Sequence, residues 1–435
     1  MFRGGPLGIA VGVDLRRETF KQLATDNILN AEIVGFGSTD ISGSRTLGAA
    51  FVELNAPITK QLEASFALRA DKASTAEASL VPKFGLSYKV SDSLLLRGTA
   101  AEGFRAPNLP ETGKGYVSAF QNSLNDPKRC ATATQLYNVL KTGNAIDVSD
   151  GLRIRDSGCS ASAGLLIVPN KDLEAEKSKS YTLGFVFEPN KHFNIAIDYF
   201  NIKRRNEIGT KSIDQVLAQE DKLPGSVGRN AVSADDLAAS DRAKQLSGKD
   251  IQFTTGTLSV IKSRYENLNK TRVSGIDLDM STRWDLGSNK LMVGMEATYN
   301  LDYRGWDENV NDYTENLVGN YENYRFVGVG KISLESGNWV TGTRIKYASA
   351  TSLNDNKYDS NNSIQGCEDR GIPATDCGLG ADTTVDFSLQ YKGFKNQSIV
   401  LNVGNLFKRH AITNVRLTNP PLRDRVLKLS YEYRF

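Results

Sequence analysis

The chain of 435 residues has no run of about eighteen consecutive apolar residues, which is the length that a helix needs to cross a bilayer. This absence excludes a transmembrane helix, but it leaves open a membrane protein that crosses with strands, whose apolar residues alternate with polar ones. The mean hydropathy of −0.36 is typical of a soluble protein but is also compatible with a protein that crosses a membrane with strands. Composition alone therefore does not separate a membrane-spanning sheet from a soluble protein.

Histidine and cysteine are scarce, with two and four residues. His192 and His410 lie far from the cysteines in the sequence and no CxxC is present, so we expect no zinc site, other metal site or cofactor. Two histidines also give no plausible catalytic triad, so we expect no enzyme activity. The cysteines form two local pairs in segments rich in polar residues and glycine. This favours loop disulfides over free thiols, made in an oxidising compartment: Cys130 with Cys159, and Cys367 with Cys377.

Proline is also scarce (12 residues), whereas glycine (38), tyrosine (16) and phenylalanine (18) are abundant, a balance that suits many paired strands. No basic run stands out, because 53 basic and 50 acidic residues are mixed along the chain. Nucleic acid is therefore not an expected partner. Residues 1–7 lack the features of a secretory signal, which an exported protein needs. We expect either that the signal was removed or that this is part of a longer protein.

Alternating apolar and polar residues recur along the chain in runs of about ten residues. The same pattern is found in six internal runs, at residues 7–16, 62–70, 181–187, 193–199, 291–303 and 385–392. A tilted strand of this length can cross a bilayer with one face toward lipid and the other toward a wet lumen. The final run is the clearest, with one apolar face made by Leu427, Leu429, Tyr431, Tyr433 and Phe435.

The connections between these runs alternate in length. We expect short turns at 57–60, 90–93, 189–192, 286–289, 336–338 and 393–397. We expect long loops at roughly 20–43, 106–177, 207–255, 305–322, 350–381 and 406–423. A soluble sandwich or propeller has no reason to place every long loop at one end. The pattern predicts an all-β fold, an antiparallel transmembrane β-barrel with about fourteen strands. One external-loop helix is predicted at 233–246, with Ser233 as its cap.

Five segments, in order, resemble those of TonB-dependent outer-membrane receptors. Residues 95–111, LLRGTAAEGFRAPNLPE, are similar to the mid-barrel pattern R-x-S-x-G-F-R-A-P-x-L-x-E. Residues 169–178, PNKDLEAEKS, are similar to N-P-x-L-K-P-E-x-S, although Lys171 and Ala175 replace its usual prolines. The resemblance spans essentially the whole chain. Later segments that resemble the family are residues 201–208, 273–278 and 401–407, together with the terminal Phe435.

This resemblance implies a receptor in the outer membrane of a Gram-negative bacterium. Such a receptor binds a scarce nutrient (an iron chelate, a vitamin or an oligosaccharide) and imports it with energy from the TonB complex. The family fold has a plug inside a barrel of about 22 strands. We therefore expect residues 1–435 to be the C-terminal portion of such a barrel domain, without the plug and the segment that contacts TonB. The alternatives are a complete, passive fourteen-stranded pore and a secreted carbohydrate-binding β protein.

Three positions are candidates for specific roles. Arg105, with Glu111, is interpreted as a charged group that stabilises the loop where a strand leaves the barrel, or alternatively as a ligand contact. Trp306 is either an interfacial girdle residue or a surface on which a substrate stacks. The resemblance implies that Phe435 is recognised by the outer-membrane barrel-assembly machinery. We expect ligand contacts in the loops at 106–177 and 207–255.

Overall fold

The computed structural model describes residues 3–29, 37–307, 311–320, 323–352, 367–368, 371, 373, 377–409 and 424–434. Within these residues, fourteen long strands each pair antiparallel with the next long strand along the chain, as the sequence predicts. The strands are β1 (Gly8–Gln22), β2 (Thr39–Pro57), β3 (Leu62–Ala73), β4 (Ser79–Ser91), β5 (Leu94–Arg105), β8 (Glu176–Asn190), β9 (Phe193–Thr210), β11 (Leu258–Leu286), β12 (Asn289–Asp307), β14 (Phe326–Ser336), β15 (Trp339–Ala348), β18 (Asp382–Phe394), β19 (Gln397–Gly404) and β20 (Val426–Tyr433).

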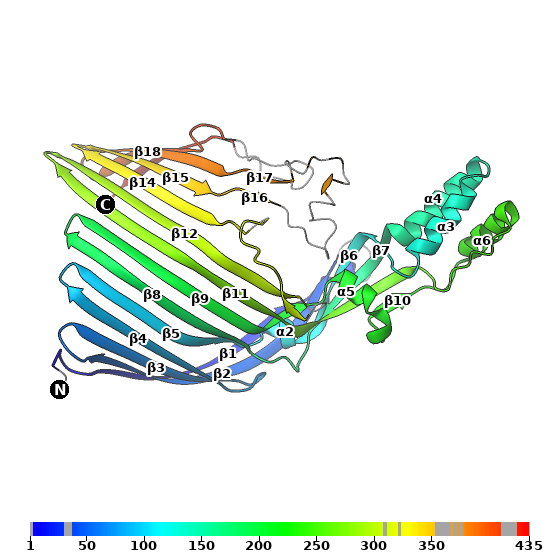
Figure 1. Ribbon diagram of the computed structural model, residues 1–435, viewed down its shortest axis with the longest axis horizontal. Coiled ribbons are helices and arrows are strands. Elements are labelled where there is room, and N and C mark those ends of the chain that lie inside the picture. Colours follow the sequence, from blue (N-terminus) through cyan, green and yellow to red (C-terminus); the bar gives the residue numbers. More distant parts are fainter. Residues whose placement is uncertain are drawn as a thin grey trace.

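The short turns lie together at one end of the sheet, and the helices lie beyond the other end (Figure 1). Gly287, Gly337 and Asn396 have positive φ angles of 66°, 55° and 58°, the left-handed conformation that tight hairpin turns require. Glycine and asparagine adopt it at low cost. These residues explain why the chain reverses after so few residues at this end.

The backbone registers place the apolar side chains of successive strands on one face. Ile9 faces Leu54, which faces Phe66 of β3. At the other edge of the sheet Leu401 faces Leu429. Of these side chains, Ile9, Phe66 and Leu429 are exposed in the isolated chain, with Leu429 at 73%. They form a continuous apolar band of the kind that faces lipid.

The opposite face of the sheet is polar and carries ion pairs between neighbouring strands. They join Arg97 to Asp198, Lys331 to Glu296 and Lys346 to Asp386. The sheet is therefore two-faced over its whole width, which the alternating sequence predicts. Among the described residues, no backbone pairing joins β20 to β1, and no helix is long and apolar enough to span a membrane.

The two longest loops carry their own secondary structure beyond the barrel strands. Their elements are α2 (Leu109–Thr112), β6 (Lys114–Leu124), α3 (Cys130–Leu140), α4 (Ala145–Cys159), β7 (Ala161–Val168), α5 (Ile213–Ala218), η1 (Glu220–Lys222), β10 (Val227–Arg229) and α6 (Ala234–Ser247). β7 runs parallel to the first part of β11, β6 pairs with β7 and β2, and β10 pairs with β11. The remaining short elements are α1 (Asp26–Leu29), β13 (Asp312–Tyr313), β16 (Thr351–Ser352) and β17 (Gly378–Leu379).

The helix predicted at 233–246 is confirmed as α6. The side chain of Ser233 accepts a hydrogen bond from the backbone N–H of Asp236, and the Asp236 carboxylate accepts one from the N–H of Ser233. This reciprocal capping satisfies two backbone donors that the first turn of the helix would otherwise leave unpaired. The other helices of these loops, α3, α4 and α5, are not among the predicted elements, because their segments stand out in the sequence only as polar.

Candidate ligand site at the long-loop end

Arg105 joins three elements where β5 ends. Its guanidinium lies 3.0 Å from the carboxylate of Glu111 in α2 and 2.6 Å from that of Glu176 in β8. Glu111 is 7% exposed and also forms a reciprocal cap with Asn108 at the start of α2. The backbone N–H of Asn170 donates to the Glu111 carbonyl at 2.7 Å. Arg105 therefore holds the loop after β5 against the start of β8.

These contacts agree with the interpretation that Arg105 stabilises the loop where a strand leaves the barrel. The side chain of Arg105 is nevertheless 41% exposed, so part of its guanidinium faces solvent while two carboxylates hold it in place. A contact between Arg105 and a ligand stays a prediction.

Trp306 lies near the end of β12 in a group of aromatic and basic side chains. Its ring meets that of Tyr313 edge to face, with centroids 5.5 Å apart. The ammonium of Lys270 lies 3.7 Å from the Trp306 ring centroid, and the guanidinium of Arg272 lies 5.6 Å from that of Tyr313. A cation over an aromatic ring is a favourable contact. Both interpretations of Trp306, an interfacial girdle residue or a surface on which a substrate stacks, stay predictions.

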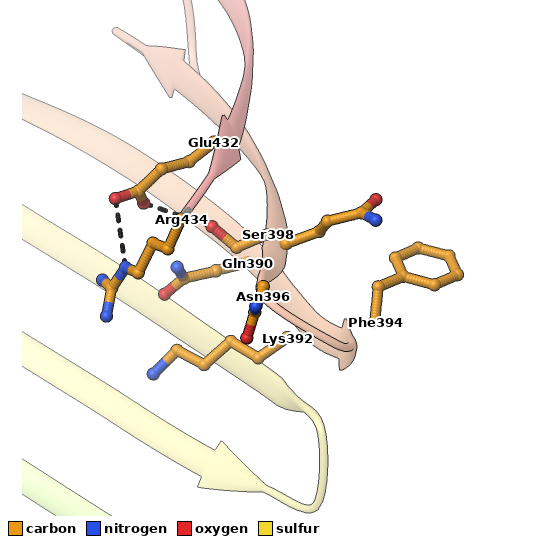
Figure 2. A pocket seen from close by; sticks show the side chains of 8 residues that line it. Gln390, Lys392, Phe394, Asn396, Ser398, Glu432 and Arg434 are labelled. Carbon is orange, nitrogen blue, oxygen red and sulfur yellow. Dashed lines mark hydrogen bonds and ion pairs between the residues drawn. The ribbon is translucent and has the colours of Figure 1, made fainter.

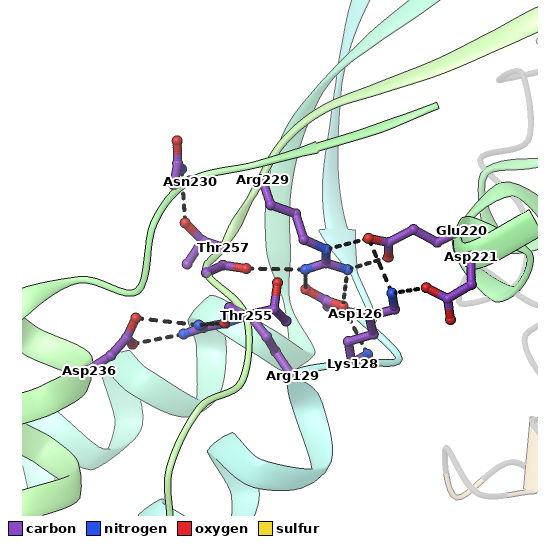
Figure 3. Close-up of polar contacts among 11 residues, drawn as sticks. Asp126, Lys128, Arg129, Glu220, Asp221, Arg229, Asn230, Asp236, Thr255 and Thr257 are labelled. Carbon is purple, nitrogen blue, oxygen red and sulfur yellow. Dashed lines mark hydrogen bonds and ion pairs between the residues drawn. The ribbon is translucent and has the colours of Figure 1, made fainter. Parts of the chain in front are cut away.

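A network of buried charges joins the loops at 106–177 and 207–255 (Figure 3). Arg229 of β10 donates to both carboxylate oxygens of Asp126, at 2.7 and 2.9 Å, and to those of Glu220. Arg129 donates to the Asp236 carboxylate at 2.8 Å and to the Thr255 carbonyl at 2.6 Å. Asp126 and Arg129 are both fully buried. The two long loops therefore form a single packed unit, which we call the loop unit (residues 106–177 and 207–257).

The charges of this network lower the pKa values of two of its carboxyl groups, Glu220 and Asp236. The hydrogen bonds from Arg229 lower the pKa of Glu220, and partial burial opposes this only in part. For Asp236, burial opposes ionisation most strongly, but the hydrogen bonds from Arg129 and from the Ser233 N–H outweigh it and lower its pKa. Both groups are therefore ionised at neutral pH.

A basic cleft of about 320 Å³ opens at the base of the loop unit, between β11 and the segment that follows α5. Its walls include the apolar side chains of Val168, Val216 and Leu223, and four cations line it against one carboxylate, Glu266. Lys211 pairs with Glu266 at 3.4 Å, so the cleft keeps a positive excess. A compact anion with an apolar part fits this lining. The cations are Lys211, Lys222, Lys262 and Arg264.

The comparison with known families agrees with this architecture. The family model described as "TonB dependent receptor-like, beta-barrel" matches residues 2–406. The chain belongs to the TonB-dependent receptors. These are outer-membrane proteins of Gram-negative bacteria, and the chain is therefore an outer-membrane protein. In such barrels the short turns face the periplasm and the longer loops face outward. We therefore expect the loop unit of this TonB-dependent receptor to face outward.

Several solved structures that resemble this chain are described as siderophore receptors. The siderophore receptor PirA from Acinetobacter baumannii superposes with a TM-score of 0.62 and 15% identity over 99% of this chain. A mutant of the ferric enterobactin receptor PfeA from Pseudomonas aeruginosa gives 0.59 and 14%, also over 99%. The "Probable TonB-dependent siderophore receptor PirA" of A. baumannii is 25% identical over 118 residues, which are 26% of this chain and 16% of that protein. At these identities the superpositions show a shared fold.

This receptor chain spans about half the length of the receptors that it resembles, covering 52% of the PirA structure and 51% of the PfeA structure. Both expected disulfides are present, one between Cys130 and Cys159 and the other between Cys367 and Cys377. The first joins the start of α3 to the end of α4, so this loop disulfide lies within a helical hairpin. Phe435, the expected assembly signal, lies outside the described residues.

A second cavity, of about 310 Å³, lies at the short-turn end of the receptor and was not predicted. Figure 2 shows Glu432 and Arg434 near the C-terminus beside Gln390 and Lys392 of β18. Ser398 donates to the Glu432 carboxylate across the β19–β20 pair. The sequence does not predict this cavity, because it forms between the hairpin at 390–398 and the strand end at 432–434, more than thirty positions away, and their proximity depends on register.

Proposed function

We propose that this chain provides the barrel strands and external loops of a receptor that takes up a ferric siderophore with energy from the TonB complex. One observation carries the proposal: the family match runs from residue 2 to 406, and structures of siderophore receptors superpose on 99% of the chain. The family is one of receptors and transporters, and a transport role without enzymatic chemistry is part of the proposal.

The basic cleft favours an anionic iron chelate over a vitamin or a neutral oligosaccharide. Four cations surround a space whose walls are partly apolar, and the carboxylate of Glu266 offsets only one of them. A cleft with low-dielectric walls strengthens the attraction for a negatively charged ligand and raises its rate of association. Ferric catecholates combine negative charge with apolar rings, which are the two features that this lining favours.

Binding to the full 435-residue chain in detergent tests the choice of ligand. The probe is ferric enterobactin, and quenching of tryptophan fluorescence is the readout. We expect saturable quenching that weakens with salt, whereas a neutral ferric hydroxamate should bind at least tenfold more weakly. Equal affinity for the two chelates would contradict an anionic substrate.

Two double variants separate the cleft from charge in general. Lys222→Gln with Lys262→Gln removes two cations of the cleft and should raise the Kd for ferric enterobactin about tenfold. The matched control, Lys83→Gln with Lys428→Gln, removes the same charge from β4 and β20, away from the cleft, and should leave the Kd within about twofold. An equal rise of the Kd in both variants would show that the cleft is not the binding site.

The dependence on TonB is tested in cells. The gene is expressed with its upstream reading frame in an iron-limited host that lacks its own ferric-enterobactin receptor, with and without TonB. Growth that requires TonB supports energised uptake, whereas growth without it supports a passive pore. Sequencing the frame upstream of Met1 decides whether the same gene encodes a plug and a segment that contacts TonB.

A further inference from the structure

Four basic side chains lie directly opposite one another across four neighbouring strands. In the backbone registers Lys179 of β8 faces Lys203 of β9, and Lys203 faces Arg272 of β11. Arg272 in turn faces Arg304 of β12. Like charges directly opposite each other on adjacent strands repel, so this row is unfavourable unless negative charge offsets it.

The row is the centre of a larger basic group. Lys177 and Arg205, two residues further along β8 and β9, also face each other in the register. Lys270 lies two residues before Arg272 on β11, beside Trp306. We call this group the basic belt, and it consists of Lys177, Lys179, Lys203, Arg205, Lys270, Arg272 and Arg304.

The belt lies on the same face of the sheet as the apolar band. Side chains alternate between the two faces along a strand. Lys179 therefore lies on the same face of β8 as Tyr181 and Leu183, and Lys203 lies on the same face of β9 as Tyr199. Leu183 and Tyr181 are 68% and 50% exposed, as lipid-facing residues are in an isolated chain. The belt therefore sits where the outward face leaves the hydrocarbon and meets the headgroups of the external leaflet.

Among the residues that the structure describes, two carboxylates pair with belt residues, which is too few to neutralise the belt. Glu102 lies 3.1 Å from Lys179, and Asp302 lies 2.7 Å from Arg272 and 2.8 Å from Arg304. Seven cations against these two carboxylates leave an excess of five positive charges. The side chain of Lys179 is 54% exposed and those of Arg272 and Arg304 about a third, so the cations are accessible from outside the barrel.

We propose that the basic belt binds the phosphate groups of a multiply phosphorylated lipid in the outer leaflet. Phosphate accepts paired hydrogen bonds from the planar guanidinium of arginine, and lysine contributes point charges on flexible stems that extend along the apolar surface to the headgroups. Adjacent strands are about 4.8 Å apart, so the four-strand row spans about 15 Å, which accommodates two phosphates of one headgroup. The proposal concerns the outer wall of the barrel and is independent of the transported ligand.

The test uses the full chain in detergent micelles and three forms of one glycolipid: lipid A with two phosphates, with one, and with none. Native mass spectrometry measures the fraction of protein that retains lipid as its concentration rises. We expect affinity to fall with each phosphate removed and to fall with salt. Equal retention of all three forms would overturn the proposal, and this comparison needs no variant to fold.

The variant Lys179→Gln with Lys203→Gln should weaken binding of the diphosphorylated lipid roughly 30-fold, at about 1 kcal/mol for each basic residue near an anionic lipid surface. The matched control, Lys83→Gln with Lys428→Gln on the polar face, should change it less than twofold. Equal losses in both would overturn the proposal. Inorganic phosphate that displaces the lipid at equal concentration would assign the belt to free anions and overturn the lipid assignment.

Discussion

Arg129 and Asp236, which are 107 positions apart in the sequence, form an ion pair of 2.8 Å in which neither side chain is more than 3% exposed. The guanidinium of Arg129 also lies 3.8 Å from the ring centroid of Phe253. The pair joins α3 of one long loop to α6 of the other, and a cluster of buried apolar residues packs around it. It is the strongest single reason to regard the loop unit as one body.

Replacing Arg129 by Met should destabilise the loop unit by about 3–5 kcal/mol, because Asp236 is then buried without its partner. Hydrogen exchange of the amides in α3 and α6 measures this loss. The double variant Arg129→Met with Asp236→Leu should recover most of it. The control is Arg155→Met, which removes a more exposed pair with Asp156. It should change the opening free energy obtained from hydrogen exchange by less than about 0.5 kcal/mol.

The loop unit should lose stability in acid. The pKa values of Asp236 and Glu220 are lowered in the folded chain from reference values of 3.8 and 4.5. A depressed folded pKa contributes stability that is fully present above the reference value and is lost as the pH falls through the folded value. Limited proteolysis should therefore be unchanged between pH 7 and pH 5 and should accelerate below about pH 4. Acceleration already at pH 6 would contradict this assignment.

The disulfide between Cys130 and Cys159 closes a loop with a sequence separation of 29 residues, against 10 for the second disulfide. In the chain-entropy model the longer loop corresponds to about 3–4 kcal/mol of stabilisation. The variant Cys130→Ser with Cys159→Ser should therefore increase hydrogen exchange across α3 and α4. The variant Cys367→Ser with Cys377→Ser is the control, and it should leave exchange in that hairpin unchanged.

Substitution of Arg105 separates its two interpretations. Arg105→Gln should cost about 1 kcal/mol of stability at the end of β5, since the guanidinium is partly exposed and its pairing is screened by solvent. If Arg105 only positions the loop, then the Kd for ferric enterobactin should stay within about twofold. A tenfold rise of this Kd without a change in hydrogen exchange at α2 would instead show that Arg105 contacts the ligand.

The helices of the loop unit differ in whether capping residues at their first turn make them predictable from the sequence. α6 is predictable because Ser233 caps it and Asp236 completes the capping box. α4 has the same kind of signal in Asn144 and Asp147, which could have been used to predict it. α3 has no side-chain cap, so its position depends on the buried Leu136 and on the disulfide at its first residue. Its formation is a consequence of packing, which is not local.

The sequence by itself determined the alternation of the strands, the positions of the short turns, the two cysteine pairs and the family, because each is encoded within a few neighbouring residues or in ordered motifs. The tertiary structure decided which side chains become neighbours across strands and loops. Lys179, Lys203, Arg272 and Arg304 are dispersed in a chain without a basic run, and only the registers bring them into one row. Register depends on pairing between distant segments, and a one-residue slip moves every side chain to the other face.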